Sequence, residues 1–198
     1  MNLVQAKILR WTEILTSIDN LGFLTTSQIQ RLHDLGGRRN TTRILNDMSE
    51  FLCSFREHET VYYLSAKGRK ELGSQKLRRR TIHTQHTLMR NDVYIAYKPD
   101  YWRVETPLKW ADKSIIPDAV FKNNNSYVFL EVDHTQSIAA NERKIELYKE
   151  LRDSGGFQRK YGAFPMIMYV TVNEHRQKRL RGLLDGFKAE VLLVNDIK

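Results

Sequence analysis

The chain has 198 residues, and its 32 lysines and arginines against 23 aspartates and glutamates give a formal net charge of +9 at pH 7. An excess of this size attracts polyanions, so nucleic acid is the first partner to consider, beside the alternative of a basic protein that its charge keeps soluble. The single cysteine, Cys53, excludes a disulfide framework and a zinc site built from several cysteines. No apolar run approaches the ~20 residues that span a bilayer, so we expect a cytoplasmic protein with no membrane partner.

The first predicted elements are one long helix and a pair of helices joined by a turn. Apolar side chains recur at helical spacing over residues 4–19, at Val4, Ile8, Trp11, Leu15 and Ile18. Thr26 begins a short helix that runs to about Leu35, and Gly36-Gly37 makes a turn. A longer helix then runs from about Arg39 to Leu52. This order predicts a helix-turn-helix.

The longer helix has two chemically different faces when its residues are projected at about 100° per step. One arc faces the core and contains Thr41, Ile44, Leu45, Met48, Phe51 and Leu52. The opposite arc contains Arg39, Thr42, Arg43, Asn46 and Glu50. Arginine suits guanine and asparagine suits adenine in the major groove. We therefore predict that the first three turns of the second arc contact double-stranded DNA.

Two short strands follow, Leu52–Arg56 and Thr60–Ser65, and they predict a two-stranded wing. Residues 1–75 are therefore predicted to form a winged helix domain. Its predicted DNA-binding residues are Arg38, Arg39, Thr42, Arg43, Asn46 and Arg56. The alternative is a three-helix platform for protein interactions, which the basic character of the exposed face disfavours.

A basic connector at residues 76–80 leads into a second predicted domain over residues 81–198. A helix over 81–97 ends before Pro99, because the residue before a proline is pushed out of the helical region. Strands are predicted at 101–109, 114–121, 126–133, 165–172 and 189–194, and helices at 138–152 and 174–185. The expected fold class is α+β or α/β, with a mixed sheet flanked by helices.

Three acidic residues are expected to meet in this second domain. Asparagines separate the strands 114–121 and 126–133, and a two-residue turn at Asn124-Asn125 places Asp118 opposite Glu131. Asp133 shares a face with Glu131 because it is two residues further along the strand. Like charges so close need neutralisation, and Mg²⁺ bound by Asp118, Glu131 and Asp133 would supply it.

The sequence here resembles a known superfamily and, within it, a known family. Pro117-Asp118 followed by Glu131-Val132-Asp133 resembles the PD-(D/E)xK signature of restriction-endonuclease-like nucleases. The winged helix, PDAVF, FLEVDHTQS and the helix with Lys144 to Tyr148 together resemble the replication-relaxation proteins of Gram-positive plasmids and mobile elements. Asp133 occupies the catalytic lysine position, which puts cleavage in doubt. The resemblance implies Asp118, Glu131 and a displaced Lys144 as the catalytic set, with Glu105 as a weaker ligand candidate.

The sequence supports three interpretations of function. The first is a double-stranded DNA-binding protein of a plasmid or mobile element, acting in replication, relaxation or transfer, with a nuclease-like domain that has lost cleavage. The second is a Mg²⁺-dependent nickase or nuclease. The third is a transcriptional regulator whose second domain dimerises or senses a ligand. Relaxosome or replication proteins and a second copy of the chain are the protein partners considered.

Overall fold

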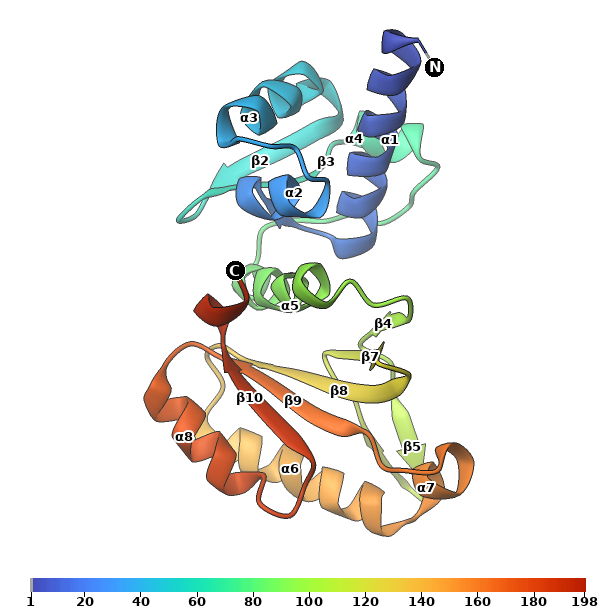
Figure 1. The fold of residues 1–198 in the computed structure, drawn as a ribbon, viewed down its shortest axis with the longest axis vertical. Coiled ribbons are helices and arrows are strands. Elements are labelled where there is room, and N and C mark those ends of the chain that lie inside the picture. The colour runs from blue at the N-terminus through green and yellow to red at the C-terminus, as the bar shows by residue number, and fades with distance from the viewer. Residues whose placement is uncertain (1) are drawn as a thin grey trace. The chain divides into compact units, whose positions relative to one another are not determined.

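The computed structural model describes residues 2–198, which fold into two compact units (Figure 1). The first unit ends at Asn91, and the second runs from Asp92 to Lys198. Helices predominate in the first unit, and the second contains a mixed sheet flanked by helices, which confirms the predicted fold class. No helix within residues 2–198 is long and apolar enough to cross a membrane.

Helix α1 (Leu3–Leu21) opens the first unit and confirms the helix predicted over residues 4–19. Asn2 caps it, because its Oδ1 accepts a hydrogen bond from the Val4 amide at 2.7 Å. The predicted apolar face is buried only in the second half of the helix. Val4 and Ile8 of this face are 63% and 59% exposed, since the first turns of α1 project beyond the rest of the unit (Figure 1).

Helices α2 (Thr26–Leu32) and α3 (Arg38–Asp47) form the predicted pair, with different ends. Thr25 rather than Thr26 caps α2, because the Thr25 hydroxyl accepts a hydrogen bond from the Gln28 amide at 3.1 Å. Helix α2 ends before Leu35 because Asp34 turns the chain into the left-handed region, at φ 48°. Helix α3 ends before Leu52, and a short 3-10 turn, η1 (Ser49–Phe51), follows it.

The predicted hairpin is present as β2 (Leu52–Arg56) and β3 (Thr60–Leu64), which pair antiparallel. A short strand that the sequence did not predict, β1 (Leu24–Thr25), pairs with the other side of β3. Helix α4 (Ala66–Glu71) follows the hairpin and packs on η1. Gly68 of α4 has to be glycine, because a Cβ there would lie 2.2 Å from the Phe51 carbonyl oxygen.

The division between the units falls within helix α5 (Thr84–Tyr97). The first part of α5 belongs to the first unit: Nε2 of the Gln28 side chain donates to the Leu88 carbonyl at 2.8 Å, and Nδ2 of the Asn91 side chain donates to the Phe23 carbonyl at 2.7 Å. Leu88 also packs with Phe23 and Val61. The segment predicted as a connector, residues 76–80, therefore lies within the first unit rather than at its edge.

The second unit is built on a five-stranded sheet of order β10-β9-β8-β7-β4. Its strands are β4 (Trp102–Val104), β7 (Ala119–Asn123), β8 (Ser126–Asp133), β9 (Met166–Thr171) and β10 (Ala189–Leu193). Strands β8, β9 and β10 are parallel, and β7 and β4 are antiparallel to their neighbours. The crossovers between the parallel strands are α6 (Ile138–Asp153) and α8 (Glu174–Leu183).

Both crossover helices cover the same face of this sheet (Figure 1). Their buried side chains share one core with the strands, which includes Phe129, Tyr148, Ile167, Leu180 and Val191. The short helix α7 (Gly156–Tyr161), which the sequence did not predict, leads from α6 towards β9. A 3-10 turn, η2 (Val194–Ile197), follows β10.

Two of the strands predicted in the second unit are each divided. The strand predicted at 101–109 is β4 and β5 (Leu108–Trp110), separated where Glu105 adopts φ 48°. The strand predicted at 114–121 is β6 (Lys113–Ile115) and β7, separated at Pro117, which has no amide hydrogen to give to a ladder. The predicted turn is confirmed: Asn124 and Asn125 have φ 46° and 64°, and Asn123 pairs with Ser126.

Candidate functional site

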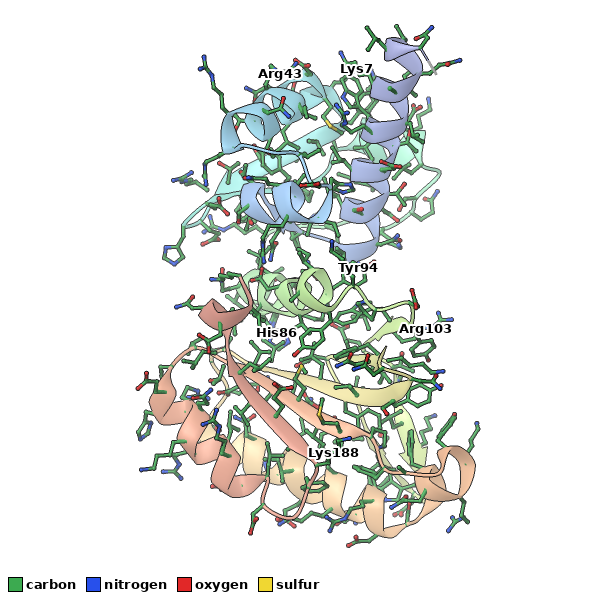
Figure 2. The ribbon with its side chains drawn as sticks, viewed as in Figure 1. Lys7, Arg43, His86, Tyr94, Arg103 and Lys188 are labelled. Carbon is green, nitrogen blue, oxygen red and sulfur yellow. The ribbon has the colours of Figure 1, made fainter. Side chains whose placement is uncertain are left out.

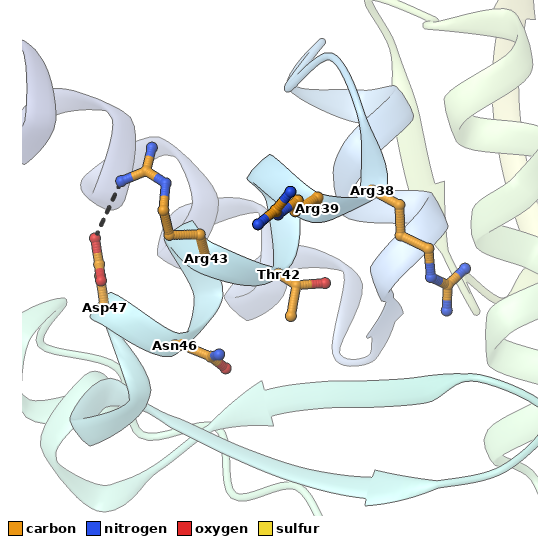
Figure 3. Close-up of a pocket in the computed structure, with 6 residues that line it drawn as sticks. All are labelled: Arg38, Arg39, Thr42, Arg43, Asn46 and Asp47. Carbon is orange, nitrogen blue, oxygen red and sulfur yellow. Dashed lines mark ion pairs between the residues drawn. The ribbon is translucent and has the colours of Figure 1, made fainter.

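The first candidate surface is the outward face of α3 (Figure 3). Thr41, Ile44 and Leu45 are buried on the inner side of this helix. Arg39, Thr42, Arg43 and Asn46 are exposed, so the predicted division of the helix into two faces is confirmed. Arg38, Arg39, Thr42, Arg43, Asn46 and Asp47 line a hollow of about 650 Å³. Five of these six side chains are basic or neutral polar, and one is acidic.

Two arginines of this surface each form an ion pair with a nearby carboxylate. Arg43 lies 3.7 Å from the Asp47 carboxylate and donates to the Asn40 side-chain oxygen at 2.9 Å. Arg38 donates to Glu59 of the hairpin turn at 2.7 Å. Both arginine side chains are more than half exposed. Exposed ion pairs contribute little stability, so a phosphate group can replace the Asp47 carboxylate at Arg43 at small cost.

Glu59 joins the hairpin turn to the start of α2. Its Oε2 accepts a hydrogen bond from the Ser27 hydroxyl at 2.6 Å, and its Oε1 accepts the bond from Arg38. Burial raises the pKa of Glu59, but the hydrogen bonds from Ser27, Thr25 and Arg38 outweigh it and hold this pKa below its ordinary value. The carboxylate is therefore charged at neutral pH and fixes Arg38 at the edge of the α3 surface.

The hairpin turn carries the remaining predicted DNA-binding residue, Arg56. This side chain is exposed at the end of β2 and donates to the Thr60 hydroxyl at 3.5 Å. The neighbouring Glu57 accepts a hydrogen bond from Arg80 at 2.9 Å, and the Arg80 guanidinium also lies over the Phe55 ring. Both glutamates of the turn, Glu57 and Glu59, are thus neutralised by arginines, which leaves the exposed edge basic.

The second candidate site is the acidic cluster on the helix-covered face of the large sheet. Glu131 and Asp133 lie on β8 and are 2% and 0% exposed. Asp118 lies next to this strand, but the β7–β8 ladder ends at Ala119 and Leu130, so Asp118 is not paired directly with Glu131 as predicted. Its amide donates to the Leu130 carbonyl at 3.0 Å, and its Oδ2 accepts from the Val132 amide at 2.7 Å. The three carboxylates therefore gather at the same end of the sheet.

Glu131 has partners on α6 for both of its oxygens. Lys144 forms an ion pair with Oε2, and the Tyr148 hydroxyl donates to Oε1 at 2.5 Å. Burial raises the pKa of Glu131 to about 8, with Asp118 adding to the rise and Lys144 opposing it. The structure thus brings the predicted Lys144 to Glu131. The sequence had assigned Tyr148 to the core only, although it is also a hydrogen-bond donor to this carboxylate.

Asp133 is held by a separate set of donors. Arg176 of α8 donates to both of its oxygens, Asn141 of α6 donates to Oδ1 at 2.8 Å, and the Thr171 hydroxyl donates to Oδ2 at 2.7 Å. Burial raises the pKa of Asp133, but these hydrogen bonds outweigh it and lower the pKa below its ordinary value. The Asp133 carboxylate is therefore charged at neutral pH and is neutralised by Arg176 of α8.

These residues do not fit the Mg²⁺ site expected from the sequence. The oxygens of Glu131 and Asp133 are directed at Lys144, Tyr148, Arg176 and their neighbours rather than at a common point. Within residues 2–198, no three His, Cys, Asp or Glu side chains form a group that could hold a metal ion. In this structure cationic and polar side chains satisfy the two buried carboxylates, and one cation shared by Asp118, Glu131 and Asp133 stays a prediction.

The comparison with known families matches most of this chain. The sequence model of the replication-relaxation family matches residues 15–167. The chain belongs to the replication-relaxation family. No curated protein matches it. Among solved structures, it is similar to the crystal structure of protein VC1899 from Vibrio cholerae, with 12% sequence identity and a TM-score of 0.41 over 94% of this chain. The chain spans about half, 48%, of the length of that protein.

The family match places both candidate sites within the replication-relaxation region. It includes α3, the β2–β3 hairpin and the Glu131 and Asp133 strand, whereas Arg176 on α8 lies beyond residue 167. Glu105, the weaker predicted ligand, is exposed on the turn after β4, and its amide donates to the Asp118 carbonyl at 3.3 Å. Arg176, the cationic partner of Asp133 in this replication-relaxation protein, thus lies outside the matched segment.

Proposed function

We propose that this replication-relaxation protein binds double-stranded DNA through the exposed face of α3, with the β2–β3 hairpin as the wing of a winged helix. The observation that carries the proposal is the sorting of α3 into a buried apolar arc and an exposed arc of Arg39, Thr42, Arg43 and Asn46. A face that packs against protein would be apolar at its centre, whereas this one presents the donors that phosphates and base edges accept.

The second unit is proposed to hold or assemble DNA-processing partners rather than to cut DNA itself. The sites of Glu131 and Asp133 support this, because each buried carboxylate is neutralised by a side chain of a covering helix. The family suggests a role in replication or relaxation of a plasmid or mobile element. Binding by the first unit would then direct the second unit to its place of action.

Duplex binding can be tested by fluorescence anisotropy with a labelled random-sequence duplex at several salt concentrations. Arg39→Ala with Arg43→Ala should weaken binding at least tenfold at low salt and reduce the salt slope by about 0.9 for each lost phosphate contact. Arg103→Ala is the matched control, because Arg103 is an exposed arginine on β4 of the second unit (Figure 2). Equal binding by the double variant and the wild type would refute the assignment of α3.

Sequence reading by the same face needs a separate measurement. Selection from a random duplex library should enrich a defined site for the wild type, and Asn46→Ala should relax the preference at one base pair while leaving random-sequence affinity nearly unchanged. A wild type that enriches nothing would limit α3 to phosphate contacts. An enriched palindrome with two half-sites would indicate that two copies of the chain bind together.

A further inference from the structure

A pocket at the β7–β8 hairpin of the second unit combines aromatic rings with lysines. Its volume is about 440 Å³, in the range of pockets that hold a small ligand. Lys122, Asn125, Tyr127, Tyr161, Phe164 and Lys188 are among its lining residues, and no aspartate or glutamate lines it. Figure 2 labels Lys188 at the start of β10. The pocket lies at the opposite ends of the strands from the acidic cluster, since Met166 begins β9 and Thr171 ends it.

The local sequence explains why aromatic surface is available at this pocket. Gly162 ends α7 in the left-handed region, at φ 83°, and this leaves Tyr161 at the rim, 44% exposed. The Tyr161 and Tyr127 rings meet edge to face, with centroids 5.0 Å apart. Tyr161 is therefore held by packing against Tyr127 and Phe157 while 44% of it stays exposed, which suits a platform on which another ring can stack.

The lysines surround the same rings. The Lys122 ammonium lies 4.9 Å from the centre of the Tyr127 ring, and the Lys160 ammonium lies 5.2 Å from that of Tyr161. Lys188 is exposed on another wall. A ligand that combines a planar ring with a phosphate would satisfy both features, because the ring would stack on tyrosine while the phosphate pairs with lysine.

We propose that this pocket binds single-stranded DNA, with one unpaired base against Tyr161 and the adjoining phosphates at Lys122 and Lys188. Duplex DNA does not suit it, because paired bases stack on one another and offer no free face to a side chain. The proposal goes beyond the duplex binding assigned to α3 and uses none of its residues. The chain would then carry one site for duplex DNA and another for an unpaired strand.

The test is anisotropy of a labelled oligothymidine with the full chain. Tyr161→Ala should weaken this binding about tenfold, as loss of one stacked base does, and Tyr161→Phe should stay within about twofold because it keeps the ring. Lys188→Gln should reduce the salt slope by about 0.7. The matched control is Lys178→Gln, which removes one exposed charge from α8 near the other ends of the strands.

Crosslinking locates the strand directly. A single-stranded oligonucleotide that carries one 5-iodouracil should crosslink to the full chain under ultraviolet light. After proteolysis, the crosslinked peptide should contain Tyr161 or Tyr127. Crosslinks elsewhere, an equal loss in Lys178→Gln, or no binding of oligothymidine by the wild type would each overturn the proposal. Failure of this site is distinguishable from failure of the α3 surface, because Arg39→Ala with Arg43→Ala should weaken duplex binding at least tenfold and leave the Tyr161 crosslink in place.

Discussion

The Arg176 guanidinium meets the Asp133 carboxylate side on, with Nε donating to Oδ2 at 2.7 Å and Nη2 donating to Oδ1. This bidentate pair joins the end of β8 to the first turns of α8. Nη2 also donates to the Gln136 carbonyl, so the loop between β8 and α6 is held by the same side chain. The pair therefore holds together the end of the sheet where the three acidic residues gather.

Removal of Arg176 should destabilise the second unit. Arg176→Met leaves Asp133 buried with no cationic partner, and breaking such a pair costs about 3–5 kcal/mol, here near the lower end because the arginine side chain is 20% exposed. Urea unfolding monitored by circular dichroism measures this. The control is Arg179→Met, whose pair with Glu142 is exposed and 3.9 Å long and should contribute under about 1 kcal/mol. Similar losses in the two variants would contradict a specific role for the Asp133 pair.

Glu131 should make stability depend on pH. Its pKa is about 8 in the folded protein against an ordinary 4.5, so the folded state binds a proton that the unfolded state has lost between these values. Stability from this group is therefore fully present below pH 4.5 and is lost as pH rises through 8, with a slope of at most about 1.4 kcal/mol per pH unit. Urea unfolding at pH 5 to 8 should show a decline that Glu131→Gln removes. If the free energy of unfolding falls equally with pH in both proteins, the pKa of Glu131 is not raised in the folded state and its carboxylate is charged throughout this range.

The local elements and one register were predictable from sequence, whereas the ion pairs of the acidic cluster were not. The faces of α3 follow from helical periodicity, and Asn124-Asn125 determine the pairing that brings Asp118 to Glu131. Arg176 is 43 positions from Asp133, and their meeting depends on the crossover from β8 to β9 and on the start of α8 beyond it. The clustered carboxylates predict that a positive charge lies beside them, but no local sequence pattern indicates that the Arg176 side chain supplies it to Asp133.

The exposure of the first turns of α1 was not predictable from sequence, for a related reason. Periodicity identifies the apolar face of a helix but not how far the body beneath it extends, so Val4 and Ile8 continue the stripe of Leu15 and Ile18 without being covered. Similarly, the break in the predicted strand at Pro117 follows from the missing amide hydrogen, yet the separate β5–β6 pair depends on packing against α6. Long-range packing decides both features.

Supercoiled plasmid incubated with the protein and Mg²⁺ or Mn²⁺ should remain uncut. The physical reason is that Lys144 and Tyr148 hold the oxygens of Glu131 and that Arg176 holds those of Asp133, which leaves no shared set of ligands for a cation. Conversion to open circles on an agarose gel is the measurement. Glu131→Gln is assayed in parallel, since nicking by the wild type that disappears in this variant would establish a Mg²⁺-dependent nickase and reject the proposal of a non-cleaving second unit.

Neutralising Glu59 should tighten duplex binding while weakening the fold. Glu59→Gln releases Arg38 towards the α3 surface and removes a negative charge that accepts hydrogen bonds from Ser27 and Arg38. The interaction of two unit charges in contact in water is worth about 1 kcal/mol. Removing the negative charge of Glu59 should therefore raise the affinity for a random-sequence duplex about two- to fivefold at low salt. The lost hydrogen bonds should cost about 1–2 kcal/mol in urea unfolding. Glu50→Gln is the control, because it removes the same charge from an exposed glutamate that pairs with Lys67 beyond the end of α3. If Glu50→Gln raises affinity equally, the gain reflects net charge alone, whereas a gain confined to Glu59→Gln places Arg38 in contact with DNA.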